Sequence, residues 1–333
     1  MQSELDDFEK YLSLFTESKY AIGVANATDG LELAIHSLNL SPGDQVICSS
    51  HTMLATASAI KLSGAIPVPV DIGLDGLIDP CCVENAINTS TVGIMPTHLN
   101  GRTCEMNKIM KIAKSNNLFV VEDAAQALGS RFRGQHAGTF GYAGAISFYP
   151  AKVLGCLGDG GALLTNKYST FDKLYQLHDH GRNSKGEQIS WGRNSRLDNI
   201  NAAILDFKLK SYTTVVNRRR NIASAYEVGL NQISEIKLPP APNDSTDNFD
   251  VYQNYEIVAE NRDNLREFLK GKGIGTLIQW GGKALHQWKG LGLERELPVT
   301  DKYFKRCLML PINLFVSDCD IAYVIESIRE FYR

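Results

Sequence analysis

The stretch Ser147-Phe-Tyr-Pro-Ala-Lys152-Val-Leu-Gly-Cys-Leu-Gly-Asp-Gly-Gly161 places a single lysine inside an apolar, glycine-rich run. The lysine stem would be buried by its aromatic and branched neighbours, Phe148, Tyr149, Val153 and Leu154. A lysine in such surroundings loses hydration, which lowers its pKa and makes the free amine a usable nucleophile. The alternative is a solvated lysine in a loop. The apolar neighbours of Lys152 favour the reactive amine.

An acidic pair, Glu122-Asp123, closes the hydrophobic segment Leu118-Phe-Val-Val upstream of this stretch. An aspartate beside a pyridine nitrogen keeps that nitrogen protonated, so that the ring can withdraw electrons from a carbanion. Lys152 and Asp123 together predict a lysine that forms a Schiff base with pyridoxal 5′-phosphate and an aspartate that faces the ring nitrogen of this cofactor.

Short apolar segments alternate with helical ones through the first half of the chain. Strands are expected at 20–25, 45–48, 66–71, 92–96, 118–122 and 145–148, and helices at 4–16, 31–38, 52–63 and 106–115. This alternation is typical of an α/β fold with a mostly parallel central sheet between helices. The prolines in 66–71 predict an edge strand. Ligands of such sheets bind beyond the carboxyl ends of the strands, where residues 27–30, His98, Asp123 and Lys152 would meet.

The second half of the chain predicts a smaller domain. Residues 198–231 are expected to form a long helical stretch, and 239–247 have the composition of a linker. Residues 250–333 alternate strand and helix again, with a strand at 252–259 and helices at 265–270 and 321–332. We therefore predict a large cofactor-binding domain at 1–215 and a small C-terminal α/β domain at 216–333, with the boundary between 205 and 245.

Composition narrows the function classes. The chain has 333 residues and a formal net charge of −3, without the broad basic surface that nucleic acid requires. No apolar run has the length of a membrane span, and the first seven residues are too acidic for a signal peptide. Seven scattered cysteines lack metal-ligand spacing, and the histidine pair His178/His180 has an i+2 spacing that does not share a helix face. We expect a cytoplasmic protein with free thiols and no metal, nucleic-acid or membrane partner.

The segment Asn26-Ala-Thr28-Asp29-Gly30 ends one strand and opens a helix. Its backbone amides and the Thr28 hydroxyl could form an anion site for the cofactor phosphate. An ordinary helix N-cap by Asn26 or Thr28 is the alternative. The presence of Asp123 and Lys152 on the same sheet favours phosphate binding.

The ordered motifs of the chain resemble a known enzyme family. They are Asn26-Ala-Thr-Asp-Gly-Leu, Thr97-His-Leu-Asn-Gly, Glu122-Asp-Ala-Ala-Gln-Ala, Ser147-Phe-Tyr-Pro-Ala-Lys, Gly158-Asp-Gly-Gly-Ala, His180-Gly-Arg and Asn194-Ser-Arg-Leu-Asp. In this order they resemble the DegT/DnrJ/EryC1/StrS sugar aminotransferases, which are fold-type I pyridoxal phosphate enzymes. The resemblance extends from about residue 19 to the C-terminus.

The resemblance implies a role for each residue of the cofactor site. Lys152 would carry the cofactor and act as general acid–base, and Asp123 would pair with the pyridinium nitrogen. Gln126, one turn beyond Asp123, would form a hydrogen bond with the 3′-oxygen of the cofactor. Ser147 would bind the phosphate, together with the backbone of Thr28 and Asp29.

The resemblance also implies a homodimer with its active sites at the interface. Asn194 would reach the phosphate of the neighbouring subunit's cofactor, and Arg196 would meet a carboxylate or sugar oxygen there. The alternatives are a helix cap for Asn194 and a surface ion pair for Arg196. His180, which lies in a family motif, is a further candidate substrate residue.

Two segments depart from the family pattern. Where relatives have an aromatic ring that stacks on the cofactor, this chain has Met53, and His51 could take over that role. Where many relatives have a His-Tyr-Pro run, it has Ile278-Gln-Trp280-Gly-Gly-Lys283-Ala-Leu-His286. Trp280 could stack on a sugar or base and Lys283 could meet a phosphate or carboxylate. Otherwise Trp280 belongs to the core and Lys283 is solvated.

The expected reaction is transfer of an amino group from L-glutamate to a keto-sugar, with pyridoxamine 5′-phosphate as the intermediate form of the cofactor. The resemblance favours a nucleotide-linked keto-deoxysugar in surface-polysaccharide or aminosugar biosynthesis. A non-nucleotide keto-sugar acid remains an alternative substrate. A sugar dehydratase and a catalytically silent regulatory homologue are alternative functions, although dehydratases of the family lack the lysine that is present here as Lys152.

Overall fold

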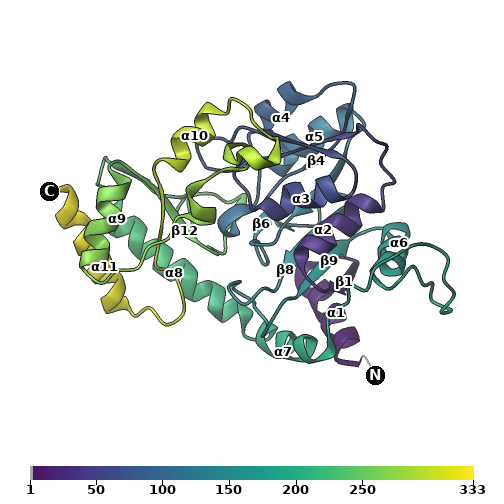
Figure 1. Cartoon of the computed structure of the whole chain (residues 1–333). Helices are drawn as coiled ribbons and strands as arrows, with labels where there is room; N and C mark the ends of the chain where they lie inside the picture. Colours follow the sequence, from purple (N-terminus) through teal and green to yellow (C-terminus); the bar gives the residue numbers. More distant parts are fainter. Residues whose placement is uncertain (1–2) are drawn as a thin grey trace.

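A seven-stranded sheet forms the centre of the larger part of the computed structural model, which describes residues 3–333 (Figure 1). Its strands lie in the order β1-β9-β8-β5-β4-β2-β3. Their bounds are β1 (Tyr20–Val24), β2 (Gln45–Ser49), β3 (Ile66–Val70), β4 (Thr91–Met95), β5 (Phe119–Asp123), β8 (Ala143–Ser147) and β9 (Gly161–Thr165). Strand β9 runs antiparallel to both of its neighbours, and the pairs from β8 to β3 are parallel. The predicted mostly parallel sheet is confirmed, with the proline-containing β3 at its edge.

Helices cover both faces of this sheet. They are α1 (Ser3–Thr16), α2 (Ala27–His36), α3 (Leu54–Leu62), α4 (Pro80–Ala86), α5 (Met106–Ser115), α6 (Tyr168–His178) and α7 (Asn199–Leu209). Leu164 of β9 packs in one core cluster with α1 and α7, whereas the adjacent Leu163 packs in another cluster with α2 and α3. Successive residues of a strand point to opposite faces, so these two clusters lie on opposite sides of the sheet.

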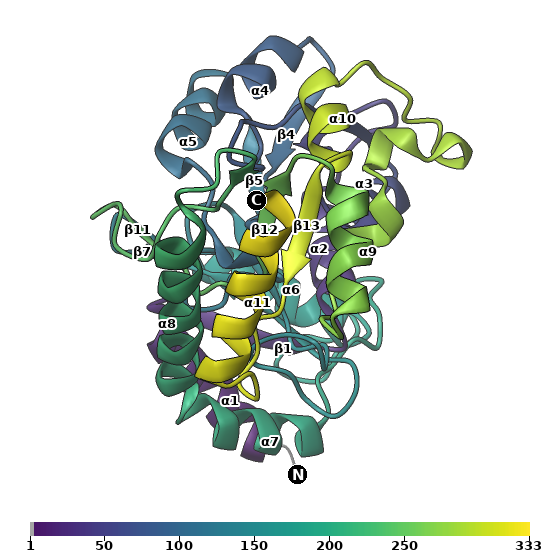
Figure 2. The same cartoon turned by 90° about the vertical axis from the view of Figure 1, so that its left-hand side faces the viewer.

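The smaller part is built on a three-stranded antiparallel sheet with the order β10-β12-β13. Its elements are β10 (Ile236–Lys237), β12 (Tyr255–Ala259), β13 (Cys307–Leu310), α8 (Tyr212–Leu230), α9 (Arg262–Gly271), α10 (Pro298–Phe304) and α11 (Asp318–Tyr332). Helix α8 runs from the larger part into the smaller one, where it lies beside α11 (Figures 1 and 2). Val216 packs in the core of the larger part and Ile222 in that of the smaller part. We propose that the domain boundary lies within α8, close to the predicted 215/216.

Some predicted elements differ from the structure. The single helical stretch expected at 198–231 is two helices, α7 and α8, which meet at residues 210–211. The segment 239–247, expected as a linker, joins β10 of the smaller part to Asn248–Phe249, which pairs with Arg131–Phe132 of the larger part. A small sheet of β6 (Arg131–Phe132), β7 (Gln135–His136) and β11 (Asn248–Phe249) was not predicted, because two-residue strands carry no periodic signal. Over residues 3–333, no helix combines the length and apolarity that crossing a membrane requires.

Candidate active site

Lys152 lies in a tight loop between β8 and β9. Its backbone N–H donates to the Tyr149 carbonyl at 2.8 Å, and a Cβ on Gly155 would come within 2.8 Å of that same carbonyl. The amine of Lys152 makes no hydrogen bond or ion pair with any residue from 3 to 333. Burial lowers the pKa of Lys152, and the negative charge of Asp123 opposes this effect. Among the described residues, the side chain is thus a largely desolvated amine without a protein partner.

Asp123 ends β5, beside β8, and is 3% exposed. Its Oδ2 accepts the Thr56 hydroxyl at 2.6 Å, and its Oδ1 accepts the Ala125 N–H at 3.1 Å. Thr56 also lies 2.6 Å from Thr52, which in turn lies 2.9 Å from Thr97. An ionised carboxylate only accepts hydrogen bonds, so Thr56 must donate to it, Thr52 to Thr56 and Thr97 to Thr52. This directed chain of buried hydroxyls holds the Asp123 carboxylate in place.

The N-terminus of α2 lies at the same edge of the sheet, because β1 ends there. Asn26 caps the helix by accepting the Asp29 N–H at 2.8 Å, and the Asp29 carboxylate accepts the Ser195 hydroxyl at 2.7 Å. The expected N-cap is therefore present and occupies one of the two backbone amides assigned to phosphate. The Thr28 hydroxyl makes no hydrogen bond within residues 3–333. Both the helix dipole and Thr28 remain available to an anion.

Gln126, three residues beyond Asp123, is held by its side-chain oxygen. Oε1 accepts the backbone N–H of Asn100 at 2.8 Å and the Asn254 amide nitrogen at 3.3 Å. Ser147 ends β8, and its hydroxyl accepts the Tyr149 N–H at 3.3 Å. Lys152, Asp123, Gln126 and Ser147 thus share the carboxyl edge of neighbouring strands β5 and β8.

Gln253, which lies in the smaller part, binds the loop that carries Lys152, here called the lysine loop. Its Oε1 accepts the Val153 N–H at 2.9 Å, and its Nε2 donates to the Ala151 carbonyl at 3.0 Å. Arg219 of α8 donates to the Gln253 carbonyl at 3.1 Å. One amide therefore fixes the backbone on both sides of Lys152.

The predicted interface residues lie at the surface of the single chain. Asn194 and His180 are exposed in the segment that follows α6. Arg196 pairs with Asp179, as the surface ion-pair alternative expected, and Asp179 also pairs with Arg182. Partial burial acts to raise the pKa of Asp179, but the two arginines hold it below its usual value.

The structure also places the residues of the two segments that depart from the family pattern. Met53 is 50% exposed and its sulfur accepts the Ala55 N–H at 3.0 Å, whereas His51 is buried and its Nδ1 bonds the Gly76 carbonyl at 2.9 Å. His51 is therefore engaged away from solvent, and Met53 remains the candidate for stacking. Trp280 packs beside His51 and Phe304 in the core, and the exposed Lys283 lies 4.9 Å from the Trp288 ring centroid. Trp280 thus packs against the core and Lys283 is exposed, and their contacts with a substrate stay predictions.

The sequence did not single out several residues that hold the site. They are Thr52, Thr56, Thr97, Asn100, Ser195, Gln253, Asn254, Glu256 and Gln279. Only Thr97, Asn100 and Ser195 lie in motifs that carry the family resemblance. Within residues 3–333, no three His, Cys, Asp or Glu side chains are grouped so as to hold a metal ion.

Comparison with known proteins identifies the family. The sequence profile of the DegT/DnrJ/EryC1/StrS aminotransferase family matches residues 1–329. The chain belongs to this family. It is 36% identical over 332 residues to a dTDP-3-amino-3,4,6-trideoxy-alpha-D-glucose transaminase of Streptomyces venezuelae, covering 98% of this chain and 87% of that protein. It is 37% identical over 331 residues to a Geobacillus stearothermophilus protein named "pleiotropic regulatory protein", covering 98% and 88%.

A solved structure agrees with this assignment. The crystal structure of S. venezuelae DesV in complex with a ketimine intermediate superposes with a TM-score of 0.94 at 35% identity, covering 99% of this chain and 89% of that one. The chain is thus a pyridoxal phosphate-dependent aminotransferase with the fold-type I architecture. The residues present fit the cofactor, because the Lys152 amine has no protein partner and the Asp123 carboxylate is already held by donors.

Proposed function

We propose that this aminotransferase transfers an amino group from L-glutamate to a nucleotide-linked keto-deoxysugar. The observation that carries the proposal is the desolvated, unpartnered amine of Lys152 beside the anchored carboxylate of Asp123. The similarity to a dTDP-aminosugar transaminase supports the sugar substrate. We further propose a place in aminosugar or surface-polysaccharide biosynthesis, and a cytoplasmic location supported by seven free cysteines.

Each residue of the site has a task in this reaction. The cofactor, when bound, supplies a ring that withdraws electrons from the carbon that bears the amino group. Asp123 would keep the ring nitrogen protonated, and Gln126 would donate to the 3′-oxygen. Nζ of Lys152 would hold the cofactor and move the substrate proton, since its lowered pKa makes the neutral amine accessible. Ser147 and Thr28 would bind the phosphate.

A homodimer is part of the proposal. The lysine loop, the segment after α6 and helix α7 expose large apolar side chains, with Leu157 81%, Trp191 93% and Phe207 77% exposed. Side chains of this size that reach solvent near a site support an interface there. Asn194, which lies in the same exposed segment, would complete the phosphate site of the partner subunit.

The first experiment is an absorbance spectrum of the purified protein before and after addition of glutamate. A visible band that glutamate bleaches, that Lys152→Ala lacks and that Lys283→Ala keeps, is the expected result, because only Lys152 is desolvated in the site. Nucleotide-linked keto-deoxysugars should then restore the band, and free keto-sugar acids should not. A protein that stays colourless with added cofactor would contradict the proposal and favour a regulatory homologue.

The dimer has its own test. Lys152→Ala and Asn194→Asp variants should each be impaired, and a mixture unfolded and refolded together should regain activity. The gain is expected because a mixed dimer has one site with both Lys152 and the partner's Asn194 intact. If each site uses the Asn194 of its own chain, mixing restores nothing.

A further inference from the structure

The backbone N–H of Asn100 determines the orientation of the Gln126 side-chain amide. A backbone N–H can only donate, so the side-chain atom that faces Asn100 N at 2.8 Å must be the oxygen of Gln126. The Gln126 nitrogen consequently points away from Asn100, and it has no acceptor within residues 3–333. A nitrogen held in this way can donate to a group that lies outside the protein chain.

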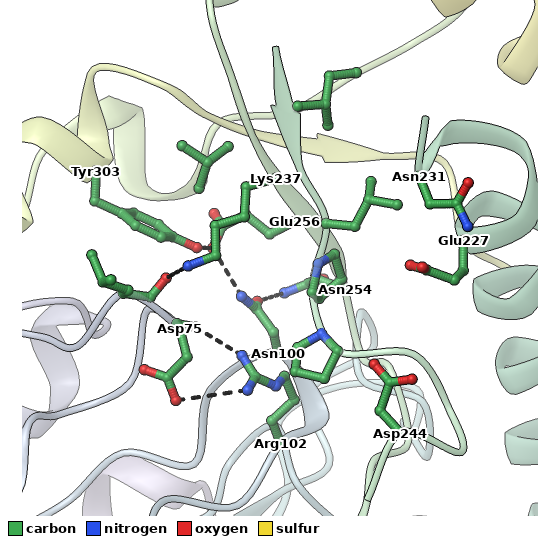
Figure 3. A pocket seen from close by; sticks show the side chains of 16 residues that line it. Asp75, Asn100, Arg102, Glu227, Asn231, Lys237, Asp244, Asn254, Glu256 and Tyr303 are labelled. Carbon is green, nitrogen blue, oxygen red and sulfur yellow. Dashed lines mark hydrogen bonds and ion pairs between the residues drawn. The ribbon is translucent and has the colours of Figure 1, made fainter. Parts of the chain in front are cut away.

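Asn254, at the entry to β12 in the smaller part, adds a second donor. Its Nδ2 lies 3.3 Å from Gln126 Oε1 and 2.8 Å from Asn100 Oδ1. Figure 3 shows Asn100 and Asn254 pointing toward each other at one side of an open cavity of about 520 Å³. The same nitrogen also faces Gln279 Oε1 at 3.5 Å, and all three oxygens accept hydrogen bonds.

The buried carboxylate of Glu256 sets the direction of these bonds. Glu256 is 5% exposed and can only accept, and it takes hydrogen bonds from Asn100 Nδ2 at 2.9 Å, Tyr303 Oη at 3.1 Å and Gln279 Nε2 at 3.2 Å. Burial raises the pKa of Tyr303 well above its usual value, which keeps its hydroxyl a donor. Because the Asn100 nitrogen faces Glu256, its oxygen faces Asn254, and Asn254 must present its nitrogen to Gln126.

The contact between the two parts of the chain is close at this point. Asn100 has φ 60°, a left-handed conformation that asparagine tolerates better than most residues. Its neighbour Gly101 lies against the smaller part, where a Cβ would come within 2.5 Å of Gln253 N. Asn254 is therefore carried to Gln126 by the backbone contact between the two parts.

We infer that Asn254 is a positioning residue that, with Glu256 and Asn100, fixes the Gln126 amide so that its N–H groups face the 3′-oxygen of the cofactor. This inference rests on the proposed binding of that oxygen by Gln126. A donor at the 3′-oxygen stabilises its ionised form and makes it less basic. With the cofactor held by Lys152, the proton at the nitrogen that joins them would then be lost at a lower pH.

The test is a pH titration of the visible band of the holoenzyme. Asn254→Asp, which replaces the donor with a second acceptor of the same size, should move the midpoint of the band upward by about one pH unit. Asn254→Ala, which removes the donor without adding charge, should move it upward by about half as much. Asn231→Asp is the matched control, since Asn231 lines the same cavity as Asn254 (Figure 3) and its side chain makes a hydrogen bond with Gln232 instead of Gln126. Its midpoint should stay at the wild-type value.

The outcomes separate this inference from the proposed function. Upward shifts in both Asn254 variants, with an unchanged control and an unchanged unfolding temperature of the cofactor-free proteins, support the inference. A normal, glutamate-sensitive band with no shift in Asn254→Ala, or with an equal shift in the control, overturns it and leaves the aminotransferase proposal standing. Should Asn254→Asp fail to fold, the alanine variant alone decides. A wild-type protein without a band overturns both.

Discussion

Replacement of Thr56 by valine should destabilise the cofactor-free protein by about 2.5–4 kcal/mol. The hydroxyl lost is a fully buried donor to the Asp123 carboxylate at 2.6 Å. A hydrogen bond to a charged group contributes about 1.5–3 kcal/mol, and the Thr52 hydroxyl, which loses its acceptor, adds about 1 kcal/mol. Valine has nearly the shape of threonine, so the change tests the hydrogen bonds rather than the packing.

Urea unfolding followed by tryptophan fluorescence measures this loss, and Thr56→Ser is the control. Serine keeps the hydroxyl and loses one buried methyl group, which costs about 1 kcal/mol. The valine variant should therefore unfold at lower urea than the serine variant, with the same slope. Its affinity for pyridoxal phosphate should also fall about tenfold, because Asp123 is no longer held in one position. A valine variant as stable as the serine variant would refute the directed chain of hydroxyls.

Three further predictions concern groups around the site. Burial raises the pKa of Glu9 to about 7, so the folded chain keeps a proton that the unfolded chain loses between pH 4.5 and 7. Stability should consequently fall by about 2–3 kcal/mol as the pH rises through this window, and Glu9→Gln should abolish the fall in urea midpoints measured at pH 5 and 8. Lys152→Met should stabilise the cofactor-free protein by about 1 kcal/mol at pH 7, because burial lowers the pKa of the lysine. The difference in stability between variant and wild type should shrink toward pH 10.5. A difference in thermal unfolding that is the same at every pH would exclude this cause. Gln253→Leu should slow the appearance of the visible band when cofactor is added, and Gln253→Glu, which keeps one of the two loop contacts, should slow it less.

The sequence predicted the fold where a single periodic signal dominated. The strands ending near Asp123 and Ser147 are continuous apolar runs, and the prolines of β3 indicated its edge position, because proline lacks the N–H that an inner strand needs. The break between α7 and α8 escaped prediction, since Lys210 and Ser211 are compatible with a helix and the turn depends on tertiary packing. The small sheet of β6, β7 and β11 was missed because its strands have only two residues each.

The site was predictable only where its residues lie in motifs. Lys152, Asp123, Gln126 and Ser147 were found because lysine chemistry and family motifs mark them, and the structure brings them to one edge. The groups that orient them come from distant positions, such as Asn254, which lies 128 residues from Gln126. No local pattern distinguishes such a residue from any other polar side chain in a loop.

The direction of hydrogen bonds, rather than their number, is the property that makes this site suited to its cofactor. Two series of buried hydrogen bonds each start at a carboxylate, which can only accept. The Asp123 carboxylate sets the donor direction of three threonine hydroxyls. The Glu256 carboxylate sets the donor direction of the side-chain amides that lead to Gln126. In the function we propose, the first series would leave an acceptor for a protonated ring nitrogen, and the second would leave a donor for an ionised oxygen. A substitution that preserves size but reverses one donor should therefore perturb the cofactor more than one that merely removes a neutral contact. Amide-to-acid changes such as Asn254→Asp are for this reason sharper probes of the site than alanine substitutions.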